Sequence, residues 1–246
     1  MRFIFLRSEG FSKVLSLTFR VVLKAVLVSS VAFSAAAIQA ADSAQFYAQI
    51  RPAVVTLSVK RALLFASREK PNSQATGFMV APGLVLTANH AVDAARSITV
   101  QLSSGEQLDA KLIKAWDSPD LALLQVSATQ VPYIAFRESG ATTGESVWAF
   151  GAPFDLPVLM TQGVISSSTI DNPADSNLQL LATDALANPG MSGGPLVGAD
   201  GQLVGLISQI HTTSEGRSGI SLAIPADRIY ALIKPRLNSP SGDLLD

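Results

Sequence analysis

The sequence predicts an all-β protein of two six-stranded antiparallel barrels, followed by one C-terminal helix. Three observations support this prediction. Twelve short segments rich in Val, Leu and Ile show the alternation that is typical of strands. Clusters of small and polar residues, such as Ser103-Ser104-Gly105, separate these segments and favour turns. About two hundred residues remain once an N-terminal targeting segment is set aside, which is enough chain for two small cores.

The predicted strands fall into two groups of six. The first group lies at 53–59, 77–80, 84–87, 98–102, 108–115 and 121–126. The second group lies at 146–150, 160–168, 178–183, 194–197, 202–210 and 219–224. A linker near 128–143 separates the groups, so we expect barrel one over about 45–135 and barrel two over about 140–237.

Two segments are predicted to be helical. A short turn at 91–95 follows His90, and residues 225–233 combine a Pro at the start with apolar residues at helical spacing. We expect this second helix to pack on barrel two. The residues after it, 238–246, are predicted to form a flexible tail. The polar segment 63–74 is either a solvated surface loop or a contributor to assembly or gating.

The first forty residues have the pattern of a secretory signal peptide. An apolar run at 25–37 ends in small residues. Five basic residues precede it: Arg2, Arg7, Lys13, Arg20 and Lys24. We expect cleavage after Ala40 and a periplasmic or secreted protein with no stable membrane insertion afterwards. The alternative is an uncleaved anchor, which the run is too short to favour, since a span needs roughly 20 apolar residues.

Composition excludes several classes of function. The chain has no cysteine, so disulfides, thiol nucleophiles and cysteine-bound metals are ruled out. Residues 1–40 hold five of the 18 basic and one of the 19 acidic residues, so the remainder carries a charge near −5, which argues against nucleic acid as a partner. Because no phosphate-binding loop or cluster of metal ligands occurs, we expect no metal and no cofactor.

A serine between glycines is the strongest chemical signal in the chain. It lies in Asn188-Pro189-Gly190-Met191-Ser192-Gly193-Gly194, where the glycines remove bulk from both sides of the hydroxyl. A nucleophilic serine needs this access, because backbone N–H groups beside it must reach the oxyanion that forms during acyl transfer. It also needs a base within hydrogen-bond reach. Ser192 is therefore a candidate nucleophile.

Two upstream motifs supply candidate partners for Ser192. His90 follows Leu86-Thr87-Ala88-Asn89 and is a candidate general base, since the imidazole titrates near neutral pH. Asp120 precedes the apolar run Leu121-Ala122-Leu123-Leu124 and is a candidate to orient the imidazole. The nearby Asp117 is the competing acid, and we expect it to cap the turn with Ser118-Pro119 instead. His211 is the other histidine, and we expect it in a polar loop after the strand 202–210.

The order His, Asp, Ser and the motifs around these residues resemble those of trypsin-like serine proteases of the HtrA/Deg type. The similarity extends over roughly 53–237 and includes Gly77-Phe78-Met79-Val80, Thr161-Gln162-Gly163-Val164-Ile165-Ser166 and the segment Gly144 to Phe154. The resemblance implies the chymotrypsin-like double barrel. It also implies peptide-bond hydrolysis through an acyl-enzyme, with His90, Asp120 and Ser192 as the catalytic triad.

The resemblance further implies where the oxyanion and the substrate bind. The oxyanion hole comprises the backbone of Gly190, Met191 and Ser192, with the N–H groups of Gly190 and Ser192 as donors. Met191 departs from the family, in which the same position holds Asp or Asn, so we expect no activation by an N-terminal ion pair. The pocket walls are expected at the substrate-binding residues Leu186, Ala187, Asn188, Ser208, Gln209 and Ile210. These segments contain no acidic residue that would bind Arg or Lys, and Ile210 is expected to make the pocket shallow. We therefore expect cleavage after small aliphatic residues.

Three functions from different classes stay open at this stage. The favoured one is an exported, metal-independent serine endopeptidase that acts on unfolded or misfolded proteins. The second is a protease-fold binding module that holds unfolded chains or a partner without cutting. The third is a hydrolase for esters or for one dedicated protein. HtrA-type proteases usually carry PDZ domains, and we expect none after residue 237. Relatives often form trimers, and the short segment 42–51 leaves both a monomer and a homo-oligomer open.

Overall fold

The computed structural model describes residues 42–61, 72–128, 130–172, 175–213 and 216–237. The predicted signal peptide at 1–40, its cleavage after Ala40 and the predicted tail at 238–246 lie outside the described residues. The same holds for most of the segment 63–74. Both barrels belong to one compact unit that begins at Ala48.

The first six strands close into a barrel in the order β1-β2-β3-β6-β5-β4. All neighbouring strands pair antiparallel, and β3, which is buried along its whole length, lies between β2 and β6. Alternation of buried and exposed residues along β1 directs one face of that strand to the barrel interior. The strands are β1 (Val54–Arg61), β2 (Asn72–Ala81), β3 (Leu84–Ala88), β4 (Ala95–Gln101), β5 (Gln107–Trp116) and β6 (Leu121–Gln125).

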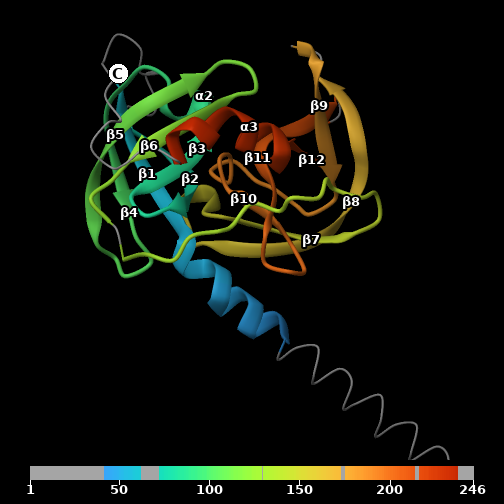
Figure 1. The fold of residues 1–246 in the computed structure, drawn as a ribbon, viewed down its shortest axis with the longest axis horizontal. Coiled ribbons are helices and arrows are strands. Elements are labelled where there is room, and N and C mark those ends of the chain that lie inside the picture. Colours follow the sequence, from blue (N-terminus) through green and yellow to red (C-terminus); the bar gives the residue numbers. More distant parts are fainter. Residues whose placement is uncertain (1–41, 62–71, 129, 173–174, 214–215, 238–246) are drawn as a thin grey trace, which may run out of the picture. The chain divides into compact units, whose positions relative to one another are not determined.

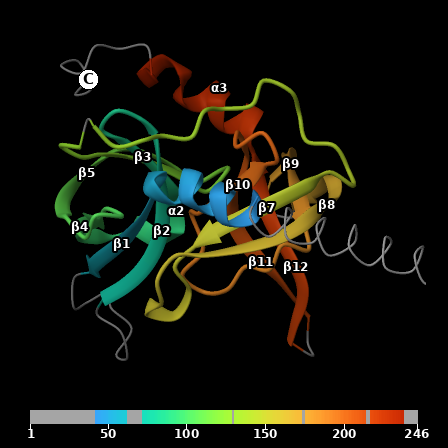
Figure 2. The same ribbon diagram turned by 90° about the horizontal axis from the view of Figure 1, so that it is seen from below.

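The last six strands form a second closed barrel in the order β10-β11-β12-β9-β8-β7. Figure 1 shows the blue and green strands of the first barrel beside the yellow and orange strands of the second, and Figure 2 gives the same separation from below. The prediction of two six-stranded antiparallel barrels is confirmed. The strands are β7 (Ser146–Gly151), β8 (Leu159–Asn172), β9 (Asp175–Thr183), β10 (Pro195–Gly198), β11 (Leu203–Thr213) and β12 (Gly216–Pro225).

The prediction that His211 lies in a loop after its strand was wrong. Strand β11 continues through Thr213 and pairs with β12 in a long hairpin, in which Thr212 faces Arg217 and Thr213 faces Gly216. Two consecutive threonines have the β-branched side chains that favour an extended backbone. The polar composition of this segment therefore does not mark the end of the strand, which continues into the hairpin.

The helices among the described residues are short. Residues 42–50 are helical and lead into the 3-10 turn η1 (Arg51–Ala53). The turn predicted at 91–95 is instead α2 (Asn89–Val92), which includes His90. The predicted C-terminal helix is present as α3 (Ala226–Leu237) and contacts β11 and β12. None of the described helices is long and apolar enough to cross a bilayer.

The chain between the barrels is attached to both of them. Ile134 N–H donates to Met79 of β2 over 2.9 Å, and Leu203 N–H of β11 donates to Ala135 over 2.8 Å. Phe136 then packs against Tyr230 of α3, with the two rings tilted and their centroids 5.4 Å apart. Direct contacts between the barrels join β1 and β2 to β7, and β3 to β11. The two barrels therefore meet along β1, β2 and β3, the last of which leads directly to His90.

Candidate active site

A histidine and an aspartate from barrel one form a tight pair at the edge of the barrel. The Nδ1 atom of His90 lies 2.8 Å from Oδ2 of Asp120, and the backbone N–H of His90 donates to Oδ1 over 2.9 Å. The same carboxylate therefore binds both the ring and the main chain of His90. The His90 side chain is 52% exposed and that of Asp120 is 21% exposed, so the pair opens to solvent on the imidazole side.

Asp120 also determines where helix α2 begins. Its backbone oxygen accepts the N–H of Asn89 over 3.2 Å, and its carboxylate accepts the N–H of His90. These are first-turn donors that have no partner within the helix. Asp120 has a positive φ of 67°, a conformation that Asp adopts more readily than most residues. A residue far along the sequence thus caps the helix that carries His90.

The surroundings of Asp120 favour its ionised form. Burial opposes ionisation, but hydrogen bonds from His90 and Ser208 outweigh it and hold the pKa of Asp120 below its ordinary value. An ionised carboxylate at Nδ1 orients the imidazole and favours the tautomer with its proton on Nδ1. The pair is therefore arranged for Nε2 to accept a proton.

Barrel two contributes the Gly-rich loop, residues 188–194, whose carbonyl groups are largely bonded. Phe154 N–H donates to Pro189 O over 3.2 Å, and Gly194 N–H donates to Met191 O over 2.9 Å. The carbonyl oxygens of Gly190 and Ser192 also accept hydrogen bonds, both from barrel one. By contrast, the N–H groups of Gly190 and Ser192 donate to no acceptor among the described residues. Two open backbone donors therefore flank Met191.

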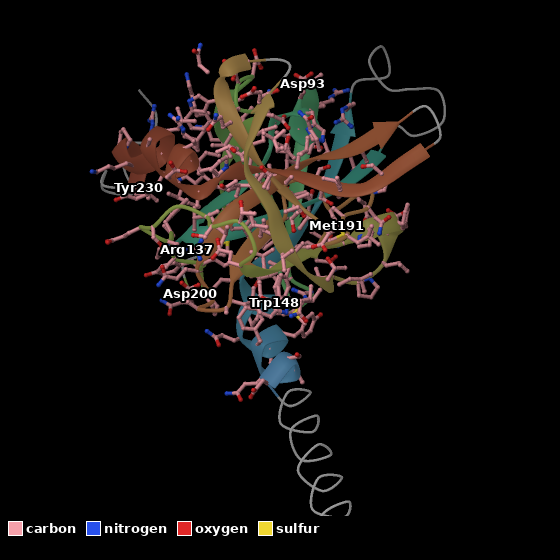
Figure 3. The ribbon with its side chains drawn as sticks, turned by 90° about the vertical axis from the view of Figure 1, so that its right-hand side faces the viewer. Asp93, Arg137, Trp148, Met191, Asp200 and Tyr230 are labelled. Atoms are coloured by element: carbon pink, nitrogen blue, oxygen red, sulfur yellow. The ribbon has the colours of Figure 1, made fainter. Side chains whose placement is uncertain are left out.

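Met191 anchors the Gly-rich loop in the core of barrel two. Its side chain is fully buried and belongs to the same apolar cluster as Val147, Ala149 and Ile207. Figure 3 shows it among the yellow strands. Its N–H donates to Asn188 O over 2.9 Å, so this N–H is occupied within the loop. An apolar anchor thus stands where the resemblance implied an acid or amide.

The backbone next to Ser192 packs tightly against barrel one. A Cβ atom added to Gly193 would lie 2.7 Å from the backbone nitrogen of Ala88, the last residue of β3, and φ of Gly193 is +84°. Only glycine fits such a contact without strain. Ser192 is partly exposed, and within the described residues no hydrogen bond joins its hydroxyl to His90. The structure thus brings the loop beside the start of α2, with the Ser192 and His90 side chains unbonded.

Ser208 is a site residue whose main contact the sequence did not reveal. Its hydroxyl donates to Oδ2 of Asp120 over 2.5 Å, and the residue is 4% exposed. The register of β11 against β12 shifts between Ile207 and Gln209, which leaves Ser208 in a bulge. A bulge reorients a side chain out of the regular alternation. Ser208 of barrel two therefore binds the acid of barrel one.

Comparison with known proteins agrees with this geometry. A family model described as a trypsin-like peptidase domain matches residues 75–206, which include His90, Asp120 and Ser192. The chain belongs to the trypsin-like peptidase family. A probable periplasmic serine endoprotease, DegP-like, from Marinomonas sp. is 39% identical to this peptidase domain over 157 residues, 63% of this chain and 34% of that relative. Serine protease HTRA1 of Xenopus tropicalis is 34% identical over 200 residues, 78% of this chain and 42% of that protein.

Solved structures show the same relationship. The crystal structure of the serine endoprotease from Yersinia pestis superposes with a TM-score of 0.66 and 30% identity, over 79% of this chain and 66% of that chain. The HtrA-type protease AlgW with a tripeptide gives a TM-score of 0.70 and 30% identity, over 79% and 63%. The peptidase domain is thus homologous to the DegP and HtrA serine proteases. It spans about a third of the length of the DegP-like relatives.

The residues expected to form the pocket walls lie on two segments of barrel two. Leu186 is 47% exposed and its carbonyl accepts the Thr161 hydroxyl over 2.9 Å, whereas Ala187 is 1% exposed. Asn188 is partly buried and begins the Gly-rich loop. Gln209 is exposed on β11, and Ile210 follows it in the same strand, where its side chain lies outside the described residues.

The remaining acid near the site has a different partner from Asp120. The carboxylate of Asp117 accepts a hydrogen bond from the Asn89 side chain over 3.0 Å, and its backbone oxygen accepts the N–H of Asp120 over 3.1 Å. Asp117 thus stabilises the turn that presents Asp120.

The hydrogen bond from Ser208 to Asp120 could not be predicted from the sequence. The two residues are 88 positions apart, and no sequence motif indicates the bulge that contains Ser208.

Proposed function

We propose that this chain is a serine endopeptidase that cleaves protein substrates through an acyl-enzyme. The observation that carries the proposal is the carboxylate of Asp120, which binds both Nδ1 and the backbone N–H of His90 at 2.8 and 2.9 Å. That double contact leaves Nε2 as the ring nitrogen able to accept a proton. Similarity to serine endoproteases over the same residues supports the assignment.

In the proposed reaction, His90 takes the proton of the Ser192 hydroxyl as the oxygen attacks the carbonyl carbon of the scissile bond. The resulting oxyanion accepts hydrogen bonds from the N–H groups of Gly190 and Ser192, which are open in this structure. Protonated His90, stabilised by ionised Asp120, then gives its proton to the leaving amine. Water, activated by the same base, releases the acid product and restores Ser192.

One observation favours a second candidate, a protease-fold binding protein. No hydrogen bond joins Ser192 to the half-exposed His90 in the described residues, as in a site that waits for a ligand. Such contacts often tighten only when substrate binds, so the endopeptidase stays the proposal. Phosphonate labelling discriminates the two, because a fluorophosphonate reacts only with an activated serine beside a formed oxyanion hole.

The test compares wild-type protein with Ser192→Ala. We expect the wild type to take up one fluorophosphonate group and to digest casein, and both activities to vanish in the variant. A matched control is Ser218→Ala, a serine on β12 outside the proposed site. A folded wild-type protein that neither takes up the probe nor digests casein would contradict the proposed endopeptidase activity. That result would favour the second candidate, a protease-fold binding protein.

We further propose cleavage after small aliphatic residues such as Val, Ala or Ile. The wall segments at 186–188 and 208–210 contain no acidic residue that pairs with a basic side chain. The wall segment 186–188 is bound by a neutral group, the buried hydroxyl of Ser221. This hydroxyl accepts the Ala187 N–H and donates to Ala185 O, both over 3.1 Å. A peptide library is expected to show preference for these residues, and dominance of Arg, Lys or Glu would overturn the proposal.

We also propose export to the periplasm or beyond. The proposal rests on the basic and apolar pattern of the first forty residues and on relatives named periplasmic serine endoproteases. Unfolded or misfolded exported proteins are the proposed substrates. Expression of the full chain in a Gram-negative host tests the location. Mature protein in the periplasmic fraction with an N-terminus near residue 41 is expected, and full-length protein in the cytoplasm would contradict it.

A further inference from the structure

Thr76 on β2 contacts the Gly-rich loop at several successive residues, although it belongs to the other barrel. Its hydroxyl donates to Gly190 O over 2.6 Å, and its backbone N–H donates to Ser192 O over 3.1 Å. Cβ atoms built on Gly193 and Gly194 would lie 2.3 Å from Thr76 O and 3.2 Å from Thr76 Cγ2. The residue is fully buried. One side chain of barrel one therefore lies along the loop that contains Ser192.

The Thr76 hydroxyl is fixed by a second partner from barrel two. It accepts the N–H of Ala152 over 2.9 Å while it donates to Gly190. Ala152 follows β7 and is itself buried. A hydroxyl has one proton, so acceptance from Ala152 directs that proton to Gly190. On the opposite side, Thr87 of β3 donates its own hydroxyl to Thr76 O over 2.8 Å.

These contacts decide which way the peptide groups of the loop face. The carbonyl oxygens of Gly190 and Ser192 both point to Thr76, and a trans peptide bond directs its N–H opposite to its carbonyl. Holding the Gly190 carbonyl fixes the peptide plane between Gly190 and Met191, and holding the Ser192 carbonyl fixes the plane after Ser192. These two planes carry the N–H groups of Met191 and Gly193, and the open N–H groups lie in the planes that precede them. Each held plane shares a Cα atom, that of Gly190 or Ser192, with the plane of an open N–H group. By holding the two carbonyls, Thr76 fixes the chain at the Cα atoms to which the open donors are attached.

We infer that Thr76 is a positioning residue for the proposed oxyanion hole, which acts through its hydroxyl on the Gly190 carbonyl. The inference rests on the proposed endopeptidase function. Thr76 does not touch the reacting atoms, so its effect is on the placement of two backbone donors. Loss of one such donor slows catalysis by about a hundredfold to a thousandfold. Misplacing the donors without removing them should slow catalysis less than this. We therefore expect about a tenfold fall in kcat when the Thr76 hydroxyl is removed.

Two substitutions at position 76 separate the hydroxyl from the methyl group. Thr76→Val keeps the shape and the methyl contact with Gly194 but removes the hydroxyl. Thr76→Ser keeps the hydroxyl and removes the methyl. Thr183→Val is the matched control, because the Thr183 hydroxyl also bridges a carbonyl and an N–H in a fully buried place, those of Val164 and Ala185. Neither partner belongs to the Gly-rich loop.

The four proteins are compared by kcat and KM on a chromogenic peptide ending in valine, and by thermal unfolding. We expect Thr76→Val to lose about tenfold in kcat with KM within about twofold, and Thr76→Ser to stay within about threefold of wild type. Thr183→Val is expected to lose comparable stability without the fall in kcat. Wild-type kcat in Thr76→Val would overturn the inference, and so would equal losses in Thr76→Val and Thr183→Val or no rescue by serine.

A second readout does not depend on activity. Amide hydrogen exchange at Met191 and Gly194, whose N–H groups are bonded within the loop, reports how firmly the loop is held. We expect faster exchange at both amides in Thr76→Val than in wild type, Thr76→Ser or Thr183→Val. Unchanged exchange overturns the inference whether or not the protein is a peptidase. A wild type that takes up no fluorophosphonate while the exchange still changes refutes the proposed endopeptidase and the catalytic role of Thr76, although the loop contact stands.

Discussion

The two halves of the candidate site are held in place by different forces. Barrel one presents His90 through charged and polar side chains, namely the Asp120 carboxylate and the Arg61 guanidinium, which donates to His90 O and Ala91 O over 3.3 and 2.9 Å. Barrel two presents Ser192 through apolar packing of Met191 and close backbone contacts at Gly193. The base is thus held mainly by charged side chains, whereas the serine is held by apolar packing together with neutral hydrogen bonds such as those from Thr76.

This difference indicates how each half responds to change. Charged contacts depend on pH and fail when one charge is removed, whereas packed contacts depend on volume and fail when a cavity or a clash appears. The halves are joined where Ser208 of barrel two binds Asp120 of barrel one. Three kinds of substitution therefore test the two halves and their junction one at a time: removal of a charge, removal of buried volume, and removal of the hydrogen bond from Ser208 to Asp120.

Removal of the charge on Asp120 is expected to have the largest effect. Asp120→Asn keeps the shape, but an amide that accepts the His90 backbone N–H turns its donor toward the ring and favours the wrong tautomer. We expect kcat to fall about ten-thousandfold, together with some loss of stability at pH 7 because the ionised carboxylate is gone. Asp117→Asn is the matched control, because that carboxylate binds only the Asn89 side chain among the described residues. Equal kcat in the two variants would refute the assignment of Asp120.

Removal of volume at Met191 tests the packed half. Met191→Ala leaves a cavity in the apolar cluster of barrel two and is expected to cost about 2–5 kcal/mol of unfolding free energy, with a fall in kcat because the Gly-rich loop loses its anchor. Met191→Leu keeps most of the volume and is expected to cost less than about 1.5 kcal/mol. Urea unfolding of both variants gives the comparison. Equal stability of Ala and Leu variants would show that packing does not hold the loop.

Substitution of Ser208 tests the junction through its pH dependence. Ser208→Ala removes one of the hydrogen bonds that lower the pKa of Asp120 while burial still raises it, so the folded-state pKa moves up. Ionised Asp120 stabilises the fold above its unfolded pKa, and this stabilisation is lost as the pH falls through the folded pKa. We expect the variant to be about 1.5 kcal/mol less stable at pH 7 and to converge with wild type in acid. A pH-independent difference would assign Ser208 to packing.

Substitution of Arg61 is expected to have the smallest effect. Arg61→Met keeps the aliphatic stem but removes the guanidinium that binds the last carbonyls of α2, so His90 becomes less firmly oriented. We expect kcat to fall about threefold and stability by about 1 kcal/mol. Arg96→Met is the control, since Arg96 is exposed on β4 and its side chain forms no hydrogen bond with the described residues. A kcat equal to that of Arg96→Met would show that Asp120 alone positions His90.

Much of the fold could be predicted because strands leave a local signal. Each of the twelve predicted segments overlaps an observed strand, and the main differences are longer ends, as in β8, which continues to Asn172. Helix α2 begins at Asn89, before the predicted turn, because Asp120 caps it from a distant part of the chain. Capping by a residue outside the helix leaves no pattern in the helix's own sequence.

In the candidate site, too, only part of the arrangement could be predicted from the sequence. His90, Asp120 and Ser192 stand in recognisable motifs, and the structure brings His90 and Asp120 into contact. The contacts made by Ser208 and Thr76 depend on a β-bulge and on the packing of two barrels, which neither composition nor spacing encodes. The charged half of the site was thus easier to predict than the contacts that join it to the packed half.

In the proposed reaction, both halves of the site meet to transfer an acyl group from the substrate to Ser192. The most direct test of this transfer is mass spectrometry of the intact protein after acid quench of a reaction with a p-nitrophenyl ester of an N-acyl valine. We expect one acyl adduct that maps to Ser192, forms in wild type and is absent from Ser192→Ala. Folded protein without an adduct, or with an adduct at another residue, would contradict it.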